Sequence, residues 1–167
     1  MDNEAKQKIH DILGEFDDAM LVTHDPKGYA HARPMRIAAC NEDRLDDVWF
    51  VTGVDSGKID EIRREPRVAV TMADGSHYLS LTGHARVVRD AAKIKELWKD
   101  SWSIWFPDGP SSEDIALIQV RPIFGEYWDQ SLPQGLSFAV EAAKAWMKDE
   151  KIDIPDGPEH HGRVLYG

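Results

Sequence analysis

The stretch from Asp47 to Asp74 constrains the fold of this chain more than any other part of the sequence. Residues 48–51 form an unbroken apolar run, which is typical of a fully buried strand. Small, turn-forming residues follow, and then a short charged helix in which Ile59 and Ile62 share one face. Pro66 ends that helix, and the alternating residues after it predict a second strand. The stretch therefore predicts two strands joined through one short helix.

The loop between the first strand and the helix is a candidate anion site. Ser56 is placed to cap the helix, and Lys58 falls in its first turn, where the helix already carries partial positive charge. A bound phosphate would remove this conflict, because backbone N–H groups, the hydroxyls of Thr52 and Ser56 and the Lys58 ammonium would converge on it. Taken alone, the local pattern favours the simpler alternative, a solvated lysine after an ordinary capping turn.

The rest of the chain predicts short strands joined mostly by turns. We expect strands at residues 19–24, 29–40, 48–51, 68–73, 76–89, 115–121 and 123–129, and helices at 2–16, 58–65, 91–105 and 136–147. An open doubly wound sheet would need a helix after nearly every strand, and most of these helices are missing. The pattern favours a mainly β (α+β) fold, an antiparallel barrel of six or seven strands with flanking helices. We expect one domain over residues 1–150 and a poorly ordered tail over 151–167.

Charge and composition exclude several classes of function. The net charge of −10 argues against nucleic acid and anionic membrane surfaces as partners, since both require a basic footprint. No apolar run approaches the ~20 residues of a membrane span, and the polar N-terminus is unlike a signal peptide, so we expect a cytoplasmic protein. The single cysteine, Cys40, excludes an intrachain disulfide and predicts a buried, inert thiol. The histidines lack metal-ligand spacing, so no metal site is expected.

Two further features are candidates for ligand contact. Arg33-Pro34-Met35 lies inside a predicted strand, where proline cannot donate to the ladder, so this part is an edge, a bulge or a ligand-facing segment. An arginine on a strand that otherwise resembles core pairs with an acid or an anion, and a surface salt bridge is an equally good alternative. Trp102 and Trp105 precede a Pro-Asp-Gly-Pro loop, which places them to cover a flat ring or a partner subunit.

Several segments together resemble the bacterial general stress flavoproteins of the general stress protein 26 type. These belong to the pyridoxamine 5′-phosphate oxidase-like superfamily of FMN-binding split β-barrels. The resemblance covers roughly Ala19 to Asp129. It depends on the order and spacing of RPM at 33–35, WFVTGVDSGKIDEIRREPRVAV at 49–70, YLSLTGHARVVRD at 78–90, WFPDGP at 105–110 and EYWD at 126–129. It implies a split β-barrel fold and a homodimer with two FMN sites at the subunit interface.

The resemblance also implies how FMN would be held. Arg33 and Lys58 would bind the phosphate, helped by Thr52 and Ser56. This agrees with the candidate anion site and favours it over the solvated-lysine alternative.

For the rest of the cofactor, the resemblance implies contacts from strands and aromatic side chains. The backbone of Pro34-Met35 and of Phe50-Val51 would lie along the isoalloxazine and ribityl chain. Tyr78 occupies a place from which a related enzyme's side chain reaches the flavin. Trp105 would come from the other subunit.

Three departures from the family pattern bear on activity. Oxidases acting on pyridoxamine phosphate carry Arg where this chain has Gly57 and Lys where it has Ala38, and their C-terminal substrate-binding segment has no counterpart here. We therefore expect an FMN-dependent oxidoreductase of flavin reductase or oxidase type, stress-related by resemblance, with NAD(P)H as electron donor and another substrate. The alternatives are a non-catalytic FMN store or redox sensor, or a split barrel holding haem or a deazaflavin.

Overall fold

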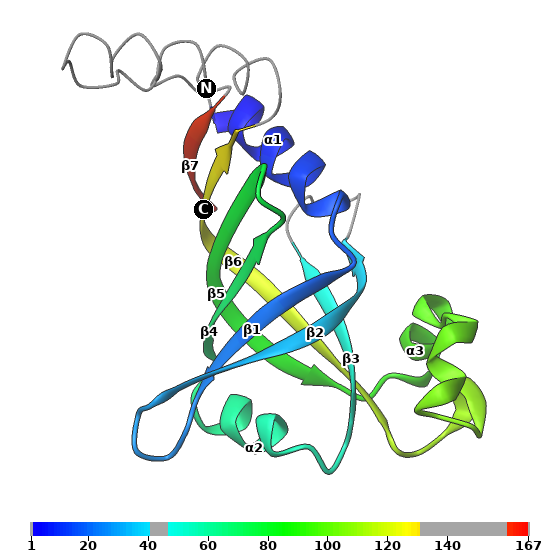
Figure 1. The fold of residues 1–167 in the computed structure, drawn as a ribbon. Coiled ribbons are helices and arrows are strands. Elements are labelled where there is room, and N and C mark those ends of the chain that lie inside the picture. Colours follow the sequence, from blue (N-terminus) through cyan, green and yellow to red (C-terminus); the bar gives the residue numbers. More distant parts are fainter. Residues whose placement is uncertain (1, 41–46, 131–159, 167) are drawn as a thin grey trace, which may run out of the picture.

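The computed structural model describes residues 2–40, 47–130 and 160–166 (Figure 1). Its elements in chain order are α1 (Asp2–Gly14), β1 (Asp18–His24), β2 (Ala30–Cys40), β3 (Val48–Gly53), α2 (Gly57–Arg64), β4 (Arg67–Ala73), β5 (His77–Val88), α3 (Ala91–Leu97), the 3₁₀ helices η1 (Asp100–Ile104) and η2 (Gly109–Ser111), β6 (Ile115–Asp129) and β7 (His161–Leu165). No helix in this described part has the length and apolar character that a membrane crossing requires.

The strands form a closed antiparallel barrel. They pair in the order β3-β2-β1-β4-β5-β6, and a further pairing of β3 with β6 closes the ring. β7 pairs with the C-terminal part of β6 and is a seventh strand that lies outside the barrel (Figure 1). Closure removes the exposed edges that an open sheet of this size would present. The predicted mainly β barrel with flanking helices is confirmed.

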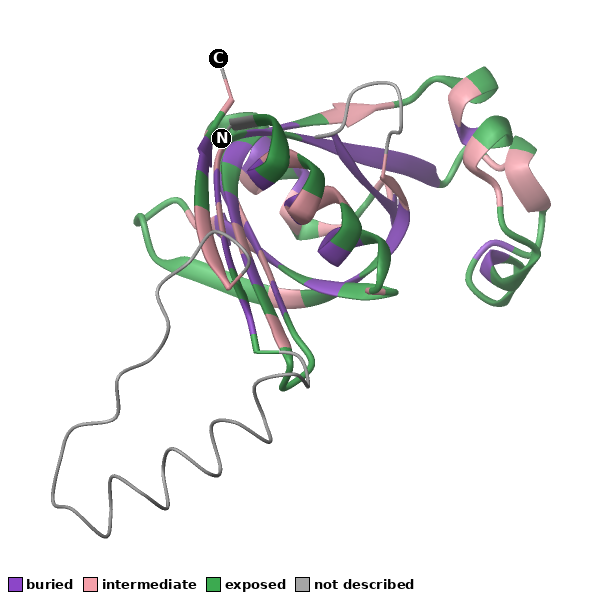
Figure 2. Cartoon of the chain, turned by 90° about the horizontal axis from the view of Figure 1, so that it is seen from above, coloured by how far each residue is buried: buried purple, intermediate pink, exposed green. Residues whose placement is uncertain are grey.

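The main core fills the barrel, and α1 covers one end of it. The apolar face of α1 buries Ile9, Ile12 and Leu13, and Figure 2 shows this helix lying across the opening of the ring of strands. At the other end, α2 lies below the strands (Figure 1) and buries Ile59 and Ile62, the two residues predicted to share its inner face. These two helices thereby close both ends of the barrel.

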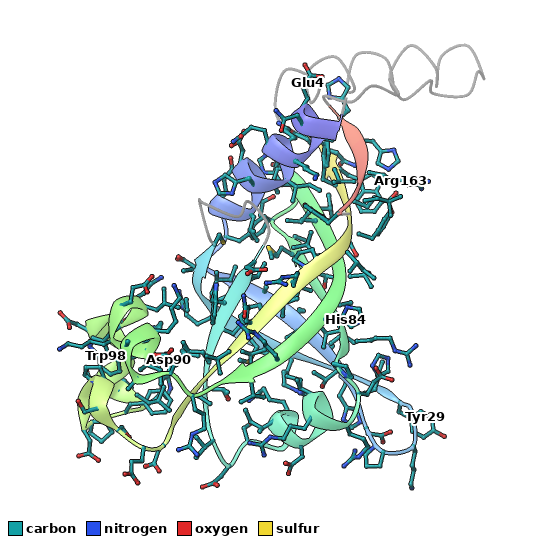
Figure 3. All side chains as sticks on the ribbon, turned by 180° about the vertical axis from the view of Figure 1, so that it is seen from behind. Glu4, Tyr29, His84, Asp90, Trp98 and Arg163 are labelled. Atoms are coloured by element: carbon teal, nitrogen blue, oxygen red, sulfur yellow. The ribbon has the colours of Figure 1, made fainter. Side chains whose placement is uncertain are left out.

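A second apolar cluster lies on the outside of the barrel, where α3 and η1 meet β3 and β6. Asp90 begins α3 as predicted, because its carboxylate accepts hydrogen bonds from the backbone N–H groups of the first turn. α3 and the 3₁₀ helices project beside the strands in Figure 1, and Figure 3 labels Asp90 and Trp98 on this segment. Trp102 is fully buried in the cluster and meets the Trp98 ring edge-on, with centroids 5.7 Å apart.

Two expectations for the tryptophan-rich segment were wrong. The helix ends at Leu97 instead of continuing to Trp105, because Trp98 adopts an extended backbone conformation (φ −56°, ψ 133°). After this break the Trp102 side chain lies inside the second cluster, where its apolar surface is removed from water. Trp102 therefore packs in the core and is unable to cover a ligand or a partner, whereas Trp105 remains exposed.

The structure also corrects the C-terminal half. β6 continues through Pro122 as one strand, where two strands were expected, because a register shift between Thr82 and Gly83 accommodates the proline. The close approach there requires glycine: a Cβ on Gly83 would lie 2.1 Å from the carbonyl oxygen of Arg121. Residues 161–165, expected in a poorly ordered tail, form β7 and bury Val164 against the core. The predicted helix at 136–147 lies outside the described residues, and the boundary at residue 150 stays a prediction.

Candidate functional site

A pocket of about 400 Å³ opens on the outside of the barrel between β2, β3, the start of α2 and the segment after η1. Its walls combine an apolar side with a polar end. It is lined by Pro34, Met35, Arg36, Val51, Thr52, Gly53, Lys58, Trp105 and Phe106. Six of these residues, Pro34, Met35, Val51, Thr52, Lys58 and Trp105, were expected from the sequence to contact one ligand. The fold therefore brings together residues that are up to 71 positions apart (34 to 105).

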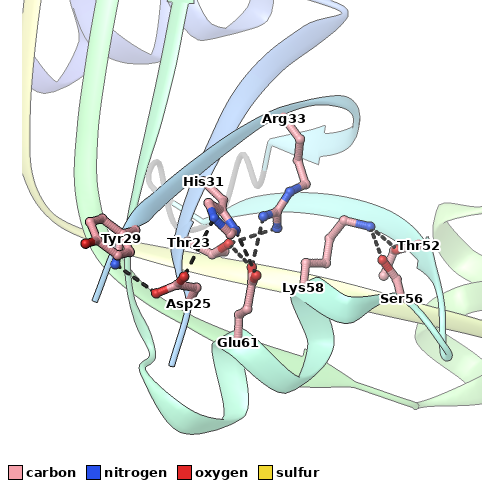
Figure 4. A network of polar contacts seen from close by, with 9 residues as sticks. All are labelled: Thr23, Asp25, Tyr29, His31, Arg33, Thr52, Ser56, Lys58 and Glu61. Carbon is pink, nitrogen blue, oxygen red and sulfur yellow. Dashed lines mark hydrogen bonds and ion pairs between the residues drawn. The ribbon is translucent and has the colours of Figure 1, made fainter. Parts of the chain in front are cut away.

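The polar end is built where β3 runs into α2. The Lys58 ammonium donates hydrogen bonds to Thr52 Oγ1, at 2.9 Å, and to Ser56 Oγ (Figure 4). Ser56 takes the N-cap position as predicted, but its hydroxyl binds Lys58 and makes no side-chain hydrogen bond to the helix. The N–H groups of Gly57 and Lys58, the first two of α2, therefore lack a side-chain cap, whereas the N–H of Ile59 donates to the Ser56 carbonyl oxygen at 2.8 Å.

Lys58 is a half-buried cation with no acidic partner among the described residues. No carboxylate there lies within the 4.0 Å of an ion pair, and its hydrogen-bond partners are two neutral hydroxyls. Burial lowers the pKa of Lys58, the Arg33 guanidinium lowers it further, and Glu61 partly opposes both. A buried charge is costly unless it is paired. This end of the pocket is therefore suited to an anionic group.

Arg33 pairs with an acid in the described structure, and its contact with an anionic ligand stays a prediction. Its Nη2 lies 2.9 Å from Glu61 Oε2, and its Nη1 donates to Thr23 Oγ1 at 2.8 Å. Thr23 also donates to Glu61, and His31 Nδ1 lies 3.2 Å from the other carboxylate oxygen (Figure 4). Although burial raises the pKa of Glu61, hydrogen bonds from Thr23, Arg33 and His31 lower it to about 2.

Sequence reasoning missed Glu61. One signal was present, because Glu61 follows Lys58 by three residues on a helix and so lies on nearly the same face. Arg33 and Glu61 are 28 residues apart in the sequence, so local pattern gave no indication that they pair.

Four predicted residues, Arg33, Phe50, Ser56 and Tyr78, are not among those that line the pocket. Phe50 is fully buried in the barrel core, so only its backbone could approach a ligand, as the prediction required. Tyr78 lines a different, shallow groove of about 390 Å³ together with Met20 and Trp128, and none of its lining residues belongs to the first pocket. Trp105, expected from a partner subunit, lines the pocket of its own chain.

One cluster of side chains outside the pocket bears on the prediction that the chain has no metal site. Glu15, Asp74 and His77 place one potential ligand atom each within 4.8 Å of one another, and His77 Nδ1 lies 3.0 Å from Glu15 Oε2 and 3.3 Å from Asp74 Oδ2. These contacts link the region after α1 to the turn before β5.

Cys40 is half-buried, less than expected, and burial raises the pKa of its thiol to about 11 although Lys99 opposes the rise. The thiol therefore stays protonated at neutral pH.

The family of the chain follows from its sequence. Residues 4–153 match the family described as pyridoxamine 5′-phosphate oxidase like, and the chain belongs to that family. A curated relative, protein bli-3 of Neurospora crassa, is 25% identical over 135 residues, an alignment covering 72% of this chain. The match spans 64% of that relative's length, so the chain corresponds to less than two thirds of it.

Solved structures share the fold. A putative general stress protein 26 from Jannaschia sp. CCS1 has a TM-score of 0.73 and 22% identity, covering 99% of this chain and 100% of its own. A related protein from Clostridium acetobutylicum has a TM-score of 0.68 and 18% identity, with coverage of 77% and 91%. A general stress FMN/FAD binding protein from Xanthomonas citri has a TM-score of 0.67 and 24% identity, also with 77% and 91%. The resemblance noted from the sequence motifs is thereby confirmed.

Proposed function

We propose that this chain is an FMN-binding flavoprotein of oxidoreductase type, which holds FMN in the pocket between β2, β3 and α2. The observation that carries the proposal is Lys58, a half-buried cation with two hydroxyl partners and, among the described residues, no acidic one. The FMN/FAD binding described for the Xanthomonas citri protein supports a flavin in this family. We infer FMN as the particular flavin, because Lys58, Thr52 and Ser56 form one compact cluster that suits a single phosphate group.

The residues present fit both parts of FMN. Lys58 and the hydroxyls of Thr52 and Ser56 offer charge-assisted and neutral hydrogen bonds to a phosphate. The rest of the wall is apolar, with Met35 and Val51 buried and Trp105 exposed at the rim, which suits a flat conjugated ring. The volume of about 400 Å³ lies within the usual range for cofactor pockets, roughly 300–1,000 Å³.

We propose further that two copies of the chain complete the site as a C2 homodimer. Tyr78 was expected to reach the flavin, yet in one chain it lies in a groove that shares no residue with the pocket. Tyr78 and Trp128 are opposite one another on β5 and β6, and both are partly exposed together with Met20. An exposed apolar patch of this kind favours a partner surface, and a second copy would bring Tyr78 to the ligand from the other side.

The chain's own contribution to the chemistry is binding and orientation. When bound, the flavin supplies hydride and electron transfer. Lys58 lies at the polar end of the pocket, and the apolar wall of Met35, Val51 and Trp105 offers no acid or base. These residues therefore fix the position of the cofactor and exclude water from one face. We propose NADH or NADPH as the electron donor, in a reaction of flavin reductase or oxidase type.

A second candidate function is FMN storage or redox sensing without turnover. The observation that favours it is the same apolar wall, since no residue of it could hold or move a proton. Haem is disfavoured, because neither histidine nor cysteine is among the residues that line the pocket. Pyridoxamine phosphate oxidation is not proposed, because Gly57 and Ala38 replace the basic residues of those oxidases.

One experiment separates catalysis from storage. The FMN-loaded protein is mixed anaerobically with NADH or NADPH, and the loss of flavin absorbance is compared with that of free FMN at equal concentration. We expect faster reduction of the bound flavin with at least one of the two nucleotides. Reduction no faster than that of free FMN with either nucleotide, in a protein that binds FMN, would favour storage or sensing.

A further inference from the structure

Glu61 lies beside the proposed phosphate site and pairs with Arg33, the second cation that the sequence predicts to hold the phosphate. It lies on α2, one turn after Lys58, and its carboxylate points toward Arg33, Thr23 and His31 (Figure 4). Its side chain is only 15% exposed, so the carboxylate is largely removed from water. A buried acid whose oxygens are all engaged has a defined geometry, and that geometry fixes its partners as well.

The Arg33 guanidinium is the group that this arrangement fixes. Thr23, which is fully buried, accepts from Nη1, and Glu61 accepts from Nη2. Two of the five N–H donors of an arginine are thereby used, and the others remain for a ligand. Without these two contacts the long side chain would sample many rotamers, and a ligand would have to order it on binding.

The positive charges of Arg33 and Lys58 are partly balanced by Glu61. Arg33 is close enough to Lys58 to lower the pKa of the lysine, and Glu61 raises that pKa. Two cations held this close repel one another when no anion is bound. The Glu61 carboxylate offsets that repulsion, and its partners Thr23, Arg33 and His31 keep it ionised. It therefore holds the Arg33 guanidinium as its ion-pair partner and reduces the repulsion between the two cations in the absence of a ligand.

We propose that Glu61 is a positioning residue for the phosphate group, acting through Arg33: it holds the guanidinium in the orientation in which the cofactor's phosphate is received. This inference rests on the proposed function, since it assumes that Arg33 and Lys58 face the phosphate of FMN. Glu61 itself does not touch the ligand. Its effect is preorganisation, which raises affinity by lowering the ordering cost of binding.

The test compares FMN with riboflavin, which lacks the phosphate. Glu61→Gln keeps the length of the side chain and one hydrogen-bond acceptor but removes the charge. We expect it to weaken FMN binding by roughly three- to tenfold, the lower part of the range for a coupling between contacting residues, with riboflavin affinity unchanged. Glu61→Asp, which keeps the charge and shortens the reach, should weaken FMN in the same direction and serves if the glutamine variant folds poorly. Affinities are measured by fluorescence titration of flavin-free protein.

The action through Arg33 is tested by a double-mutant cycle. In an Arg33→Gln background, adding Glu61→Gln should change FMN affinity little, because the group that Glu61 orients is already absent. Glu65→Gln is the matched control. Glu65 follows α2 directly, and its carboxylate pairs with Arg67 and not with Arg33. It should leave FMN and riboflavin affinities unchanged.

Three results would overturn the inference. Tighter FMN binding by Glu61→Gln would mean that the carboxylate competes with the phosphate for Arg33. An equal loss for FMN and riboflavin would show a general structural role, and an undiminished effect in the Arg33→Gln background would exclude action through Arg33. Failure of the proposed function looks different, because Lys58→Ala would then also leave the FMN-to-riboflavin ratio unchanged.

Discussion

Lys58 and Glu61 lie three residues apart on α2 and serve separate halves of one polar network. The Lys58 ammonium binds the hydroxyls of Thr52 and Ser56, whereas the Glu61 carboxylate binds the guanidinium of Arg33. A direct ion pair between the two helix neighbours would have neutralised both charges. Because each side chain binds other partners, the Lys58 charge is not neutralised by Glu61 and can pair with an anionic ligand. The Glu61 carboxylate instead orients a second cation, Arg33.

The depressed pKa of Glu61 predicts a pH dependence of stability. The folded-state pKa is about 2, below the ordinary value of 4.5, so the native state binds fewer protons than the unfolded chain between these values. The stabilisation is therefore fully present above about pH 4.5 and is lost as the pH falls toward 2. We expect it to be on the order of 1–2 kcal/mol after allowance for solvent screening.

The measurement is urea unfolding of the protein and of Glu61→Gln at several pH values from 3 to 7. The difference between their free energies of unfolding should shrink as the pH falls. A difference that is constant over this range would show that Glu61 has an ordinary pKa.

The two tryptophans of the projecting segment should behave oppositely when truncated. Trp102→Ala removes a fully buried ring from the second cluster and should lower the free energy of unfolding by about 3–5 kcal/mol. Trp105→Ala removes a side chain that is 59% exposed at the pocket rim, so stability should change little. Its expected effect is on access to the bound flavin, measured by iodide quenching of flavin fluorescence and by the reduction rate, more than on phosphate affinity. If Trp105→Ala alters none of these, its assignment to the pocket is wrong.

Alanine substitutions at Gly83 and Gly14 test the close approach of β5 and β6, with Gly14 as the control. Alanine at Gly83 would place its Cβ 2.1 Å from a backbone oxygen of β6, so we expect a loss of more than about 2 kcal/mol of unfolding free energy. Alanine at Gly14 meets no atom within 4 Å and should be neutral or slightly stabilising. Thermal unfolding followed by circular dichroism distinguishes them, and equal melting temperatures would contradict the close approach of β5 and β6.

Dimer formation is predicted from the patch that carries Tyr78 and Trp128. We expect a C2 homodimer whose interface exceeds the standard ~1,600 Å². Trp128→Glu would introduce a charge into this patch and should shift the protein toward monomer in sedimentation velocity at micromolar concentration. Arg63→Glu, an exposed residue on α2, is the control. A wild-type protein that sediments as a monomer with FMN bound would contradict the proposed assembly.

The sequence was sufficient for the parts of the fold that depend on local patterns. The apolar run of β3, the alternation of β5 and the stop at Pro66 follow from periodicity and backbone chemistry, and all three agree with the structure. Barrel closure depends on the pairing of β3 with β6, which local pattern does not encode. The tail was misjudged because five residues of β7 gain their order from β6 and the core, a tertiary effect that composition does not reveal.

The candidate site was predictable where its residues are close in sequence. Thr52, Ser56 and Lys58 belong to one loop and helix start, and their convergence follows from that connection. The pairing of Arg33 with Glu61 joins β2 to α2 across 28 residues, so the sequence left the partner of Arg33 open. Trp102 was misassigned because the helical period was extended past Trp98, where the backbone leaves the helix.

We expect Lys58 to mark a phosphate site for FMN, and a comparison of FMN with riboflavin tests this. FMN and riboflavin are titrated into flavin-free wild-type protein, Lys58→Ala and the control Lys27→Ala, whose lysine lies in the exposed turn between β1 and β2. We expect wild-type protein and the control to prefer FMN strongly. Lys58→Ala should lose roughly tenfold to a hundredfold in FMN affinity and little in riboflavin affinity, as expected for one charge-assisted contact. Equal affinities of wild-type protein for FMN and riboflavin, or an unchanged FMN affinity in Lys58→Ala, would contradict the claim.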